Sequence, residues 1–245
     1  MELIKCSNGL KKVKYIKMSN LNLTIIIPCL NESDNLRKLI PEIKTLIGKK
    51  LSFEIFIIDG IKTDIKTLKI AKNHKIKYLN RKISNNYGNA VKLGIKKSSG
   101  LHTLFMDGDF SHEPKFILKL YNKRINDVVI ASRYTTGGKT DNLFVSEFLS
   151  KILNIFYNFV LNLNLKDVSN SFRLYNTKKL KKLNLKSNHF DIIVEIIFKL
   201  KLANYKIKIK EIPYHFRQRK FGKTKRNFFI VIAYLFSILK IRLLK

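Results

Sequence analysis

With 245 residues, of which 45% are apolar, the chain is long enough for one large α/β domain with a real core, and this excludes a disordered protein. The formal net charge of +32 invites a nucleic-acid interpretation, because basic surfaces release counterions from phosphate backbones. The positive charge is mostly lysine and is scattered along the whole chain, beside abundant Asn and Ile, as an AT-rich genome would produce without selection for a ligand. We therefore expect no nucleic-acid partner, and favour a membrane surface or an anionic ligand.

The two ends of the chain carry no clear targeting or spanning signal. Residues 1–20 are rich in lysine without a continuous apolar segment, so we predict a basic disordered tail and no secretory signal. No stretch offers about 20 uninterrupted apolar residues, so no membrane-spanning helix is expected. Cys6 and Cys29 have neither disulfide nor metal spacing, which indicates a reducing compartment.

The predicted elements alternate between strands and helices from residue 23 onward. Apolar, β-branched runs predict strands at 23–28, 54–58, 75–79 and 104–106, and helical spacing predicts the intervening helices, the first of them capped by Ser33. Further strands are predicted at 128–131 and 207–213. Such alternation implies βαβ units in a mostly parallel sheet flanked by helices, with ligands beyond the carboxyl ends of the strands.

Acidic side chains follow several of these strands. Asp107 and Asp109 come one residue apart after the strand that ends at Met106, and hard cations such as Mg²⁺ and Mn²⁺ prefer such oxygen ligands. Alone, a D-x-D in a turn is more often a solvated loop or a helix cap. Glu32 and Asp59 are predicted at the same edge, where a cluster of carboxylates is costly unless a cation compensates it.

The order of these motifs resembles that of a family 2 glycosyltransferase of the dolichol-phosphate mannosyltransferase type. The segments that carry the resemblance are 27–32, the strand end at Asp59, 88–90, 107–114, 127–134, Gly137-Gly138, 167–173, 216–219 and 222–225. The resemblance implies a GT-A (Rossmann-like) glycosyltransferase domain over residues 21–227. It is followed by an apolar and basic helix over 228–245, expected to be an amphipathic helix at a membrane interface; the alternative is a terminal helix docked on the domain.

The resemblance also implies roles for individual residues. The nucleotide sugar would be bound by Pro28, Asn31, Glu32, Asp59, Gly88, Asp107 and Lys225. The metal ion, Mg²⁺ or Mn²⁺, would be held by Asp107, Asp109 and Ser111. The catalytic set would be Asp109, Arg133, Arg173 and Arg217, the arginines positioning the acceptor phosphate.

The expected reaction is metal-dependent, inverting transfer of a mannose- or glucose-type sugar from a GDP or UDP donor to a polyprenyl or dolichyl phosphate. The expected place is the cytoplasmic face of a membrane, as a peripheral protein, and the resemblance leaves room for a membrane-anchoring partner subunit. Two alternatives stay open. One is a family 2 enzyme with a glycan or protein acceptor, and the other is a non-catalytic basic relative that binds membranes or nucleic acids.

Three positions depart from the family pattern. Gly60 stands where a second acid usually follows Asp59, so recognition of the base is in doubt. Asn170 stands where the family has glycine, and asparagine tolerates the left-handed backbone better than most residues. Ser146-Glu147 stand where an arginine is often found, so an acceptor-phosphate contact is lost or supplied elsewhere.

Two helices invite a second interpretation. The helix predicted over about 143–161 is more apolar than a one-sided surface helix requires; we expect core packing to explain this, with a lipid-facing side as the alternative. Asp191 and Glu195 lie one helical turn apart; they are expected to be solvated or paired with lysine, with orientation of the acceptor as the alternative.

Overall fold

The computed structural model describes residues 21–203, 206–217, 237 and 240–243. Its elements are β1 (Leu23–Pro28), α1 (Ser33–Ile47), β2 (Phe53–Asp59), α2 (Ile65–Asn73), β3 (Lys77–Asn80), α3 (Tyr87–Lys97), β4 (His102–Phe105), α4 (Phe116–Tyr121), β5 (Val128–Ser132), β6 (Lys139–Thr140), α5 (Phe144–Leu161), β7 (Arg173–Asn176), α6 (Thr177–Leu180), α7 (Ile192–Ala203), β8 (Ile209–Pro213) and β9 (His215–Phe216). The predicted tail at 1–20 and most of the predicted helix at 228–245 lie outside the described residues. Within that helix, residues 237 and 240–243 are helical.

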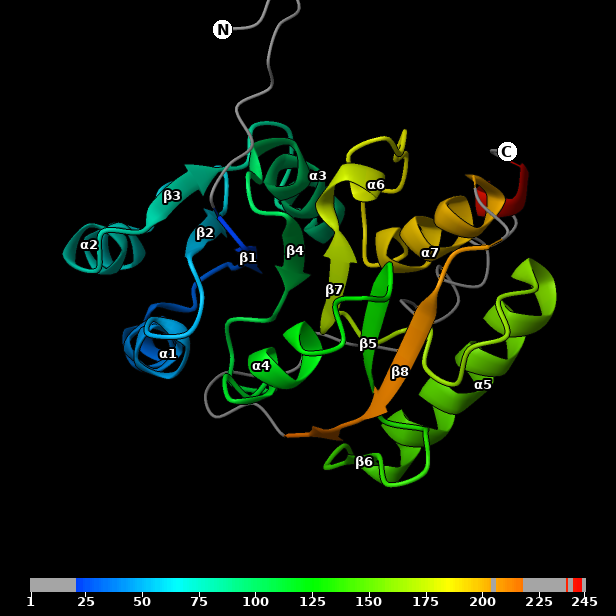
Figure 1. The fold of residues 1–245 in the computed structure, drawn as a ribbon. Helices are drawn as coiled ribbons and strands as arrows, with labels where there is room; N and C mark the ends of the chain where they lie inside the picture. Colours follow the sequence, from blue (N-terminus) through cyan, green and yellow to red (C-terminus); the bar gives the residue numbers. More distant parts are fainter. Residues whose placement is uncertain (1–20, 204–205, 218–236, 238–239, 244–245) are drawn as a thin grey trace, which may run out of the picture.

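A mostly parallel seven-stranded sheet in the order β3-β2-β1-β4-β7-β5-β8 forms the centre of the fold (Figure 1). This confirms the predicted architecture. β7 is the exception, because it runs antiparallel to both β4 and β5, and the sequence did not predict it. Since Phe105 of β4 pairs with Arg173 of β7, the residues just before β7 lie at the edge where β4 ends.

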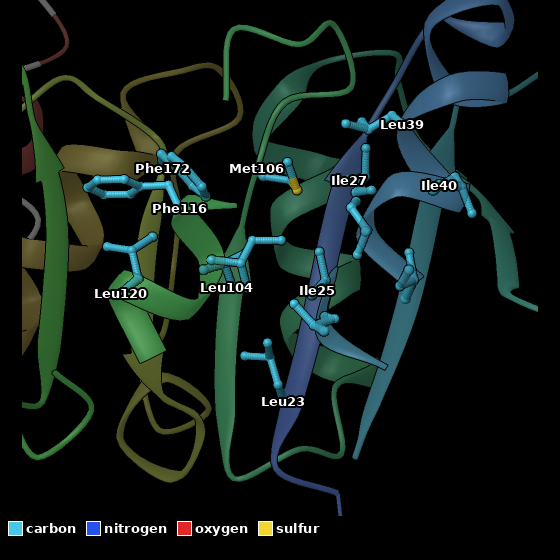
Figure 2. Packing of buried hydrophobic residues seen from close by; sticks show 14 of the residues in the cluster. Leu23, Ile25, Ile27, Leu39, Ile40, Leu104, Met106, Phe116, Leu120 and Phe172 are labelled. Carbon is cyan, nitrogen blue, oxygen red and sulfur yellow. The ribbon is translucent and has the colours of Figure 1, made fainter. Parts of the chain in front are cut away.

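Helices cover both faces of the sheet, so it has two apolar layers. One layer gathers residues of α1, α2 and α4, and the other gathers residues of α3, α5, α6 and α7. Successive residues of β1 serve different layers: Ile25 and Ile27 point into the first, and Ile26 points into the second. Figure 2 shows the first layer, where Leu39 and Ile40 from α1 and Phe116 and Leu120 from α4 surround the strand residues.

The start of the first helix differs slightly from the prediction. α1 begins at Ser33, and its N-cap residue is Glu32 and not Ser33. The amide of Asn35 donates to Glu32 Oε2 over 2.7 Å. The carboxylate that was expected in the nucleotide pocket therefore also ties the first turn of the helix.

α5 lies along the outer side of the molecule, beyond β8 and α7 (Figure 1). In the described part of the chain it is the one helix long and apolar enough to cross a membrane by length and composition, yet only 22% of it is buried. Phe148, Ile155 and Phe159 are all exposed. The expectation that core packing explains its apolar residues is therefore confirmed for only part of the helix, because its inner face packs into the second apolar layer while these outer side chains do not.

Candidate active site

Asp59 ends β2 at the carboxyl edge of the sheet, and its carboxylate organises the following turn. Its Oδ1 accepts the Gly60 N–H at 2.7 Å, and its Oδ2 accepts the Tyr78 hydroxyl at 2.7 Å and the Asp64 N–H at 3.1 Å. Burial and, after it, the hydrogen bond to Asp59 raise the pKa of Tyr78 to about 12, so the phenol stays neutral and donates. The carboxylate predicted to contact the nucleotide is fully buried.

An acid at Gly60, which the family pattern expects, would have to displace two neighbouring side chains. A Cβ at this position would lie 2.8 Å from Leu30 Cδ1 and 3.0 Å from Asn85 Oδ1. The turn is instead closed by two amides: Asn85 Oδ1 accepts the Ile61 N–H at 2.8 Å, and Asn80 Nδ2 donates to the Gly60 carbonyl at 2.8 Å. Hydrogen bonds from asparagine thus shape this turn in place of a second carboxylate.

The other residues predicted for the nucleotide pocket, as far as the structure describes them, lie near the same edge. Pro28 is the buried last residue of β1, and Asn31 follows it in the left-handed conformation with φ of 60° and an exposed side chain. Gly88 lies in the first turn of α3, the helix that follows β3, and its N–H donates to the Asn188 carbonyl at 2.8 Å. A Cβ on Gly88 would lie 2.5 Å from the Asn188 carbonyl carbon, so close packing against this backbone explains the glycine. Lys225 lies outside the described residues.

The loop after β4 brings Asp109 and Ser111 together. Asp109 is buried, and its Oδ1 accepts both the N–H and the hydroxyl of Ser111, at 3.0 and 2.6 Å. Phe110 between them has φ of 66°, a left-handed conformation that is costly for a bulky residue and is held by its surroundings. The Ser111 hydroxyl therefore positions the Asp109 carboxylate.

Asp107 is the more accessible of the two carboxylates. Its side chain is 28% exposed, and its Oδ1 accepts the Ser171 hydroxyl at 3.3 Å. No group of three or more His, Cys, Asp or Glu side chains with metal-binding geometry occurs in residues 21–203, 206–217, 237 and 240–243. The oxygen-only pair Asp107 and Asp109 nevertheless fits a hard cation, because Mg²⁺ is usually held by one or two carboxylates together with waters and substrate phosphates.

His112 is a fully buried residue that braces this loop. Its Nδ1 accepts the Asp107 N–H at 2.9 Å, and its Nε2 lies 3.2 Å from Asn170 Oδ1. Because Nδ1 accepts, the proton of the neutral ring is on Nε2. Burial lowers the pKa of His112 against the opposing charges of Asp107 and Asp109, so the ring is neutral. The ring also stacks on Phe172 with centroids 4.6 Å apart, which supports a structural role.

Asn170 connects His112 to the sheet. Its Nδ2 donates to the Ala131 carbonyl of β5 at 2.6 Å, and its N–H donates to Asp167 Oδ1 at 3.0 Å. Its φ is not positive, so a left-handed backbone does not explain its departure from glycine. The Asn170 side chain instead hydrogen-bonds to three groups, namely His112 Nε2, the Ala131 carbonyl and the Phe172 N–H.

Arg133 is buried and engaged by Asp167. Its Nε and Nη2 each lie 2.8 Å from the Asp167 carboxylate, and Nη2 also donates to Ser169 Oγ at 2.7 Å. Burial would lower the pKa of Arg133, but the charge of Asp167 outweighs burial and the pKa is raised. The guanidinium predicted to contact the acceptor thus holds the segment before β7 in place.

Arg173 is also buried away from solvent. Its Nη1 donates to the Ile193 carbonyl at 3.3 Å and its Nη2 to the Asp167 carbonyl at 3.1 Å. Its Nε has no hydrogen-bond partner in the structure. The side chain links β7 to α7 and to the segment that carries Asp167.

Arg217 is the exposed arginine of the predicted catalytic set, and it lies beside the loop after β4. Its N–H donates to the Ser111 carbonyl at 3.4 Å. Tyr214, three residues earlier, donates its hydroxyl to the same carbonyl at 2.8 Å and accepts the Glu113 N–H at 2.8 Å. The chain after β8 therefore clamps the loop with Asp109 and brings Arg217 next to it.

Sequence reasoning missed three supporting residues, namely Asp167, Tyr214 and Arg81. Arg81 is buried and donates to the carbonyls of Cys29, Ile58 and Asn85, across the ends of β1 and β2. Asp167 could have been suspected, because an acid between two arginine-bearing segments is unusual in a chain with 17 acids against 49 bases. No local sequence pattern predicts that Tyr214 and Arg81 hydrogen-bond to the loops at this edge.

Asp191 and Glu195 both serve the loop before α7. Glu195 accepts the N–H groups of Lys186 and Ser187 at 2.8 Å each and pairs with Lys199 at 2.7 Å. Asp191 Oδ1 accepts the His189 N–H at 3.1 Å. The lysine pairing expected of this pair occurs at Glu195.

The sequence of this chain is similar to a known protein family and to characterised proteins. Residues 24–183 match the model of glycosyl transferase family 2. The chain is 28% identical over 229 residues to a dolichol-phosphate mannosyltransferase of Pyrococcus furiosus, covering 90% of this chain and 64% of that protein. It is 26% identical over 214 residues to an undecaprenyl-phosphate mannosyltransferase of Micrococcus luteus, covering 82% of this chain and 86% of that protein. The chain thus spans a little under two thirds of the length of the Pyrococcus relative.

Solved structures confirm the fold. Glucosyl-3-phosphoglycerate synthase from Mycobacterium tuberculosis, in complex with Mn²⁺, uridine diphosphate and phosphoglyceric acid, superposes with a TM-score of 0.69 at 15% identity, covering 91% of this chain and 78% of that chain. The same enzyme with Mg²⁺ and uridine diphosphate gives a TM-score of 0.68 with the same coverage. At this identity the likeness establishes the GT-A-like fold alone.

Proposed function

This chain belongs to glycosyl transferase family 2, and from that membership we propose that it transfers a mannose- or glucose-type sugar from a nucleoside diphosphate to the phosphate of a polyprenol or dolichol. The names of the Pyrococcus and Micrococcus relatives support this acceptor. The observation that carries the proposal is the position of the exposed Arg217 beside the loop of Asp109 and Ser111. A cation there can bind an anionic acceptor next to the carboxylates that would bind the donor's metal ion.

Asp107 and Asp109 are the residues that would hold Mg²⁺ or Mn²⁺. When bound, the ion neutralises charge on the departing nucleoside diphosphate. Asp109 is kept in one orientation by Ser111, and Asp107 is open enough to meet a ligand. Complexes of the structural neighbour with Mn²⁺ or Mg²⁺ and uridine diphosphate support this use of a divalent ion.

The donor nucleotide is proposed to lie at the ends of β1 and β2. Asn31 and Glu32 follow β1 there, and the buried Asp59 gives the adjacent turn its shape. Gly60 and its two asparagine neighbours would then form part of the wall against the base. Whether the base is guanine or uracil is a question that a donor panel answers directly.

The acceptor phosphate needs positioning more than it needs a general base, because a phosphate monoester is already anionic at neutral pH. Arg217 is our candidate for this contact, and Lys225 stays a prediction from the sequence. Arg133 and Arg173 would act indirectly, by holding the segment from Asp167 to Ser171 against Asp107. Direct attack by the phosphate oxygen opposite the leaving group would invert the configuration at the sugar carbon.

The test is transfer from a panel of GDP- and UDP-sugars to a short polyprenyl phosphate, with and without Mn²⁺. We expect Asp109→Asn to lower kcat by about 10²-fold or more, since a preorganised electrostatic contact is lost. Arg217→Ala should mainly raise the KM for the acceptor, by about tenfold, which corresponds to roughly 1.4 kcal/mol. Arg124→Ala, an exposed arginine that packs on Tyr121 away from the loop, is the matched control and should change neither constant.

Two results would contradict the proposal. No turnover with any donor, or an Asp109→Asn protein as active as the wild type, would reject the enzyme itself. Transfer to a glycan or a protein but never to the lipid phosphate would keep the glycosyltransferase and reject the acceptor.

A further inference from the structure

The outward face of α5 carries a continuous apolar stripe. Phe144, Phe148, Ile152, Ile155 and Phe159 are all exposed, and their spacing of four, four, three and four residues places them on one side of the helix. The stripe runs from Phe144 to Phe159, so it extends over about 22 Å at 1.5 Å of rise per residue. Scattered exposed apolar residues need no explanation, but an aligned row of this length indicates an interaction surface.

The inward face of the same helix combines core contacts with hydrogen bonds to the domain: Leu153, Tyr157 and Leu161 are buried in the second apolar layer. Asn154 accepts the Val168 N–H at 2.7 Å, and Asn158 accepts the Leu165 N–H at 2.8 Å. These bonds tie α5 to the segment before β7, so the helix is held along the surface of the domain and does not cross a bilayer. A helix that is held flat against the domain by its inner face, with a row of apolar side chains pointing outward, has the geometry of a helix lying in a membrane interface.

Charge decides between the possible occupants of this stripe. Cations lie at the carboxyl end of α5, where Lys201 donates to the Leu163 carbonyl at 2.7 Å and Arg242 donates to the Val160 carbonyl. Along the helix, Lys151 is exposed and pairs with Glu147 at 2.8 Å. With a formal net charge of +32, two copies of this chain repel one another, whereas an anionic bilayer attracts each of them.

We infer that the stripe of Phe144, Phe148, Ile152, Ile155 and Phe159 is the surface by which this protein docks on an anionic lipid bilayer. The inference rests on the proposed function in one respect, namely that a lipid-linked acceptor lies in the same bilayer. On the inner face of α5, Asn154 hydrogen-bonds to Val168 and Ser169, in the segment that continues to Ser171 beside Asp107. If α5 docks on the bilayer, the segment 167–171 connects the docked helix to the loop that carries Asp107.

Tryptophan fluorescence tests the inference, because the chain has no tryptophan of its own. Phe159→Trp reports on the stripe, and Ile125→Trp is the matched control, since both side chains are 85% exposed and Ile125 lies outside α5. With vesicles of phosphatidylglycerol and phosphatidylcholine, we expect the emission of Phe159→Trp to shift to shorter wavelength and its quenching by acrylamide to fall. The emission of Ile125→Trp should not change.

A second variant separates insertion from simple charge attraction. Phe148→Lys with Ile155→Lys adds positive charge but removes two apolar side chains, so binding in vesicle cosedimentation should weaken by on the order of tenfold. Unchanged or tighter binding would overturn the inference. Activity of this variant toward a detergent-dispersed short polyprenyl phosphate should equal that of the wild type.

The remaining outcomes also decide the question. A blue-shifted Phe159→Trp emission that already exists without vesicles and does not respond to them would assign the stripe to another segment of this chain. A shift that depends on protein concentration in the absence of lipid would assign it to a second copy. Vesicle binding without sugar transfer would leave the docking surface standing and reject the proposed function, and transfer without vesicle binding would do the reverse.

Discussion

Asp167 holds the segment before β7 in one conformation. Its carboxylate accepts the side chain of Arg133 and the N–H groups of Arg133 and Asn170, and its carbonyl accepts Arg173. Burial would raise the pKa of Asp167, but Arg133 outweighs burial and lowers it. A buried ion pair of this kind contributes little net stability against an apolar pair, yet it is costly to break from one side.

We therefore expect Asp167→Asn to lower the free energy of unfolding by about 3–5 kcal/mol, because Arg133 is left buried without its counter-charge. Urea denaturation measures this. The double variant Arg133→Met with Asp167→Leu should lose less free energy of unfolding than the sum of the losses in Arg133→Met and in Asp167→Leu. Strict additivity would contradict the coupling.

The same pair gives a pH dependence with a definite sign. The folded-state pKa of Asp167 is below its unfolded value of about 3.9, so its stabilising contribution is present above that pH and is lost as the pH falls through the folded pKa. The wild type should lose stability below about pH 4 more steeply than Asp167→Asn does.

Asn170, which stands where the family pattern has glycine, forms a hydrogen bond with His112 that a glycine could not form. The imidazole needs an acceptor at Nε2, because its Nδ1 is occupied by the Asp107 N–H. Asn170 supplies that acceptor and donates to β5 through the other atom of the same amide. A glycine at this position would leave the His112 N–H without this partner.

α5 has an exposed row of apolar side chains on its outer face and both apolar and amide side chains on its inner face. Its inner face packs Leu153, Tyr157 and Leu161 into the second apolar layer, and it hydrogen-bonds to the domain through Asn154, Asn158 and Ser150. The segment 165–169 has no regular secondary structure, so these amides satisfy backbone groups that would otherwise be buried without partners.

Asn154→Leu tests this role. The Val168 N–H would lose its acceptor, which we expect to cost about 1–3 kcal/mol. Amide hydrogen exchange should speed up at Val168, and Ser146→Leu, an exposed change on the same helix, should leave it unaltered. Equal exchange in both variants would show that α5 does not hold this segment.

At the scale of the whole molecule, the described residues form two apolar layers on opposite faces of the seven-stranded sheet. Leu39 of α1 belongs to the first layer and Ile197 of α7 to the second, and both are fully buried. The side chains within each layer pack against one another, so a cavity in one layer should disturb the packing of that layer.

Leu39→Ala and Ile197→Ala should each lower the free energy of unfolding by about 2–5 kcal/mol. Because the two side chains share no layer, the double variant should be additive within about 0.5 kcal/mol. Denaturant unfolding measures all three, with the exposed Ile125→Ala as a control that should change stability by less than about 0.5 kcal/mol. A coupling well above that value would mean that the sheet transmits strain between its faces.

The carboxyl edge of the sheet, with Asp59, Asp107 and Asp109, could be predicted from the sequence, because buried parallel strands and the polar turns after them are local patterns. The antiparallel insertion of β7 could not, since four residues of strand carry little periodicity and their pairing with β4 and β5 is non-local. That insertion also decides that Arg133 and Arg173 are buried around Asp167 while Arg217 stays exposed. The outward stripe of α5 likewise depends on the tertiary structure, because apolar periodicity defines a face of a helix but does not say whether that face meets the core or the solvent.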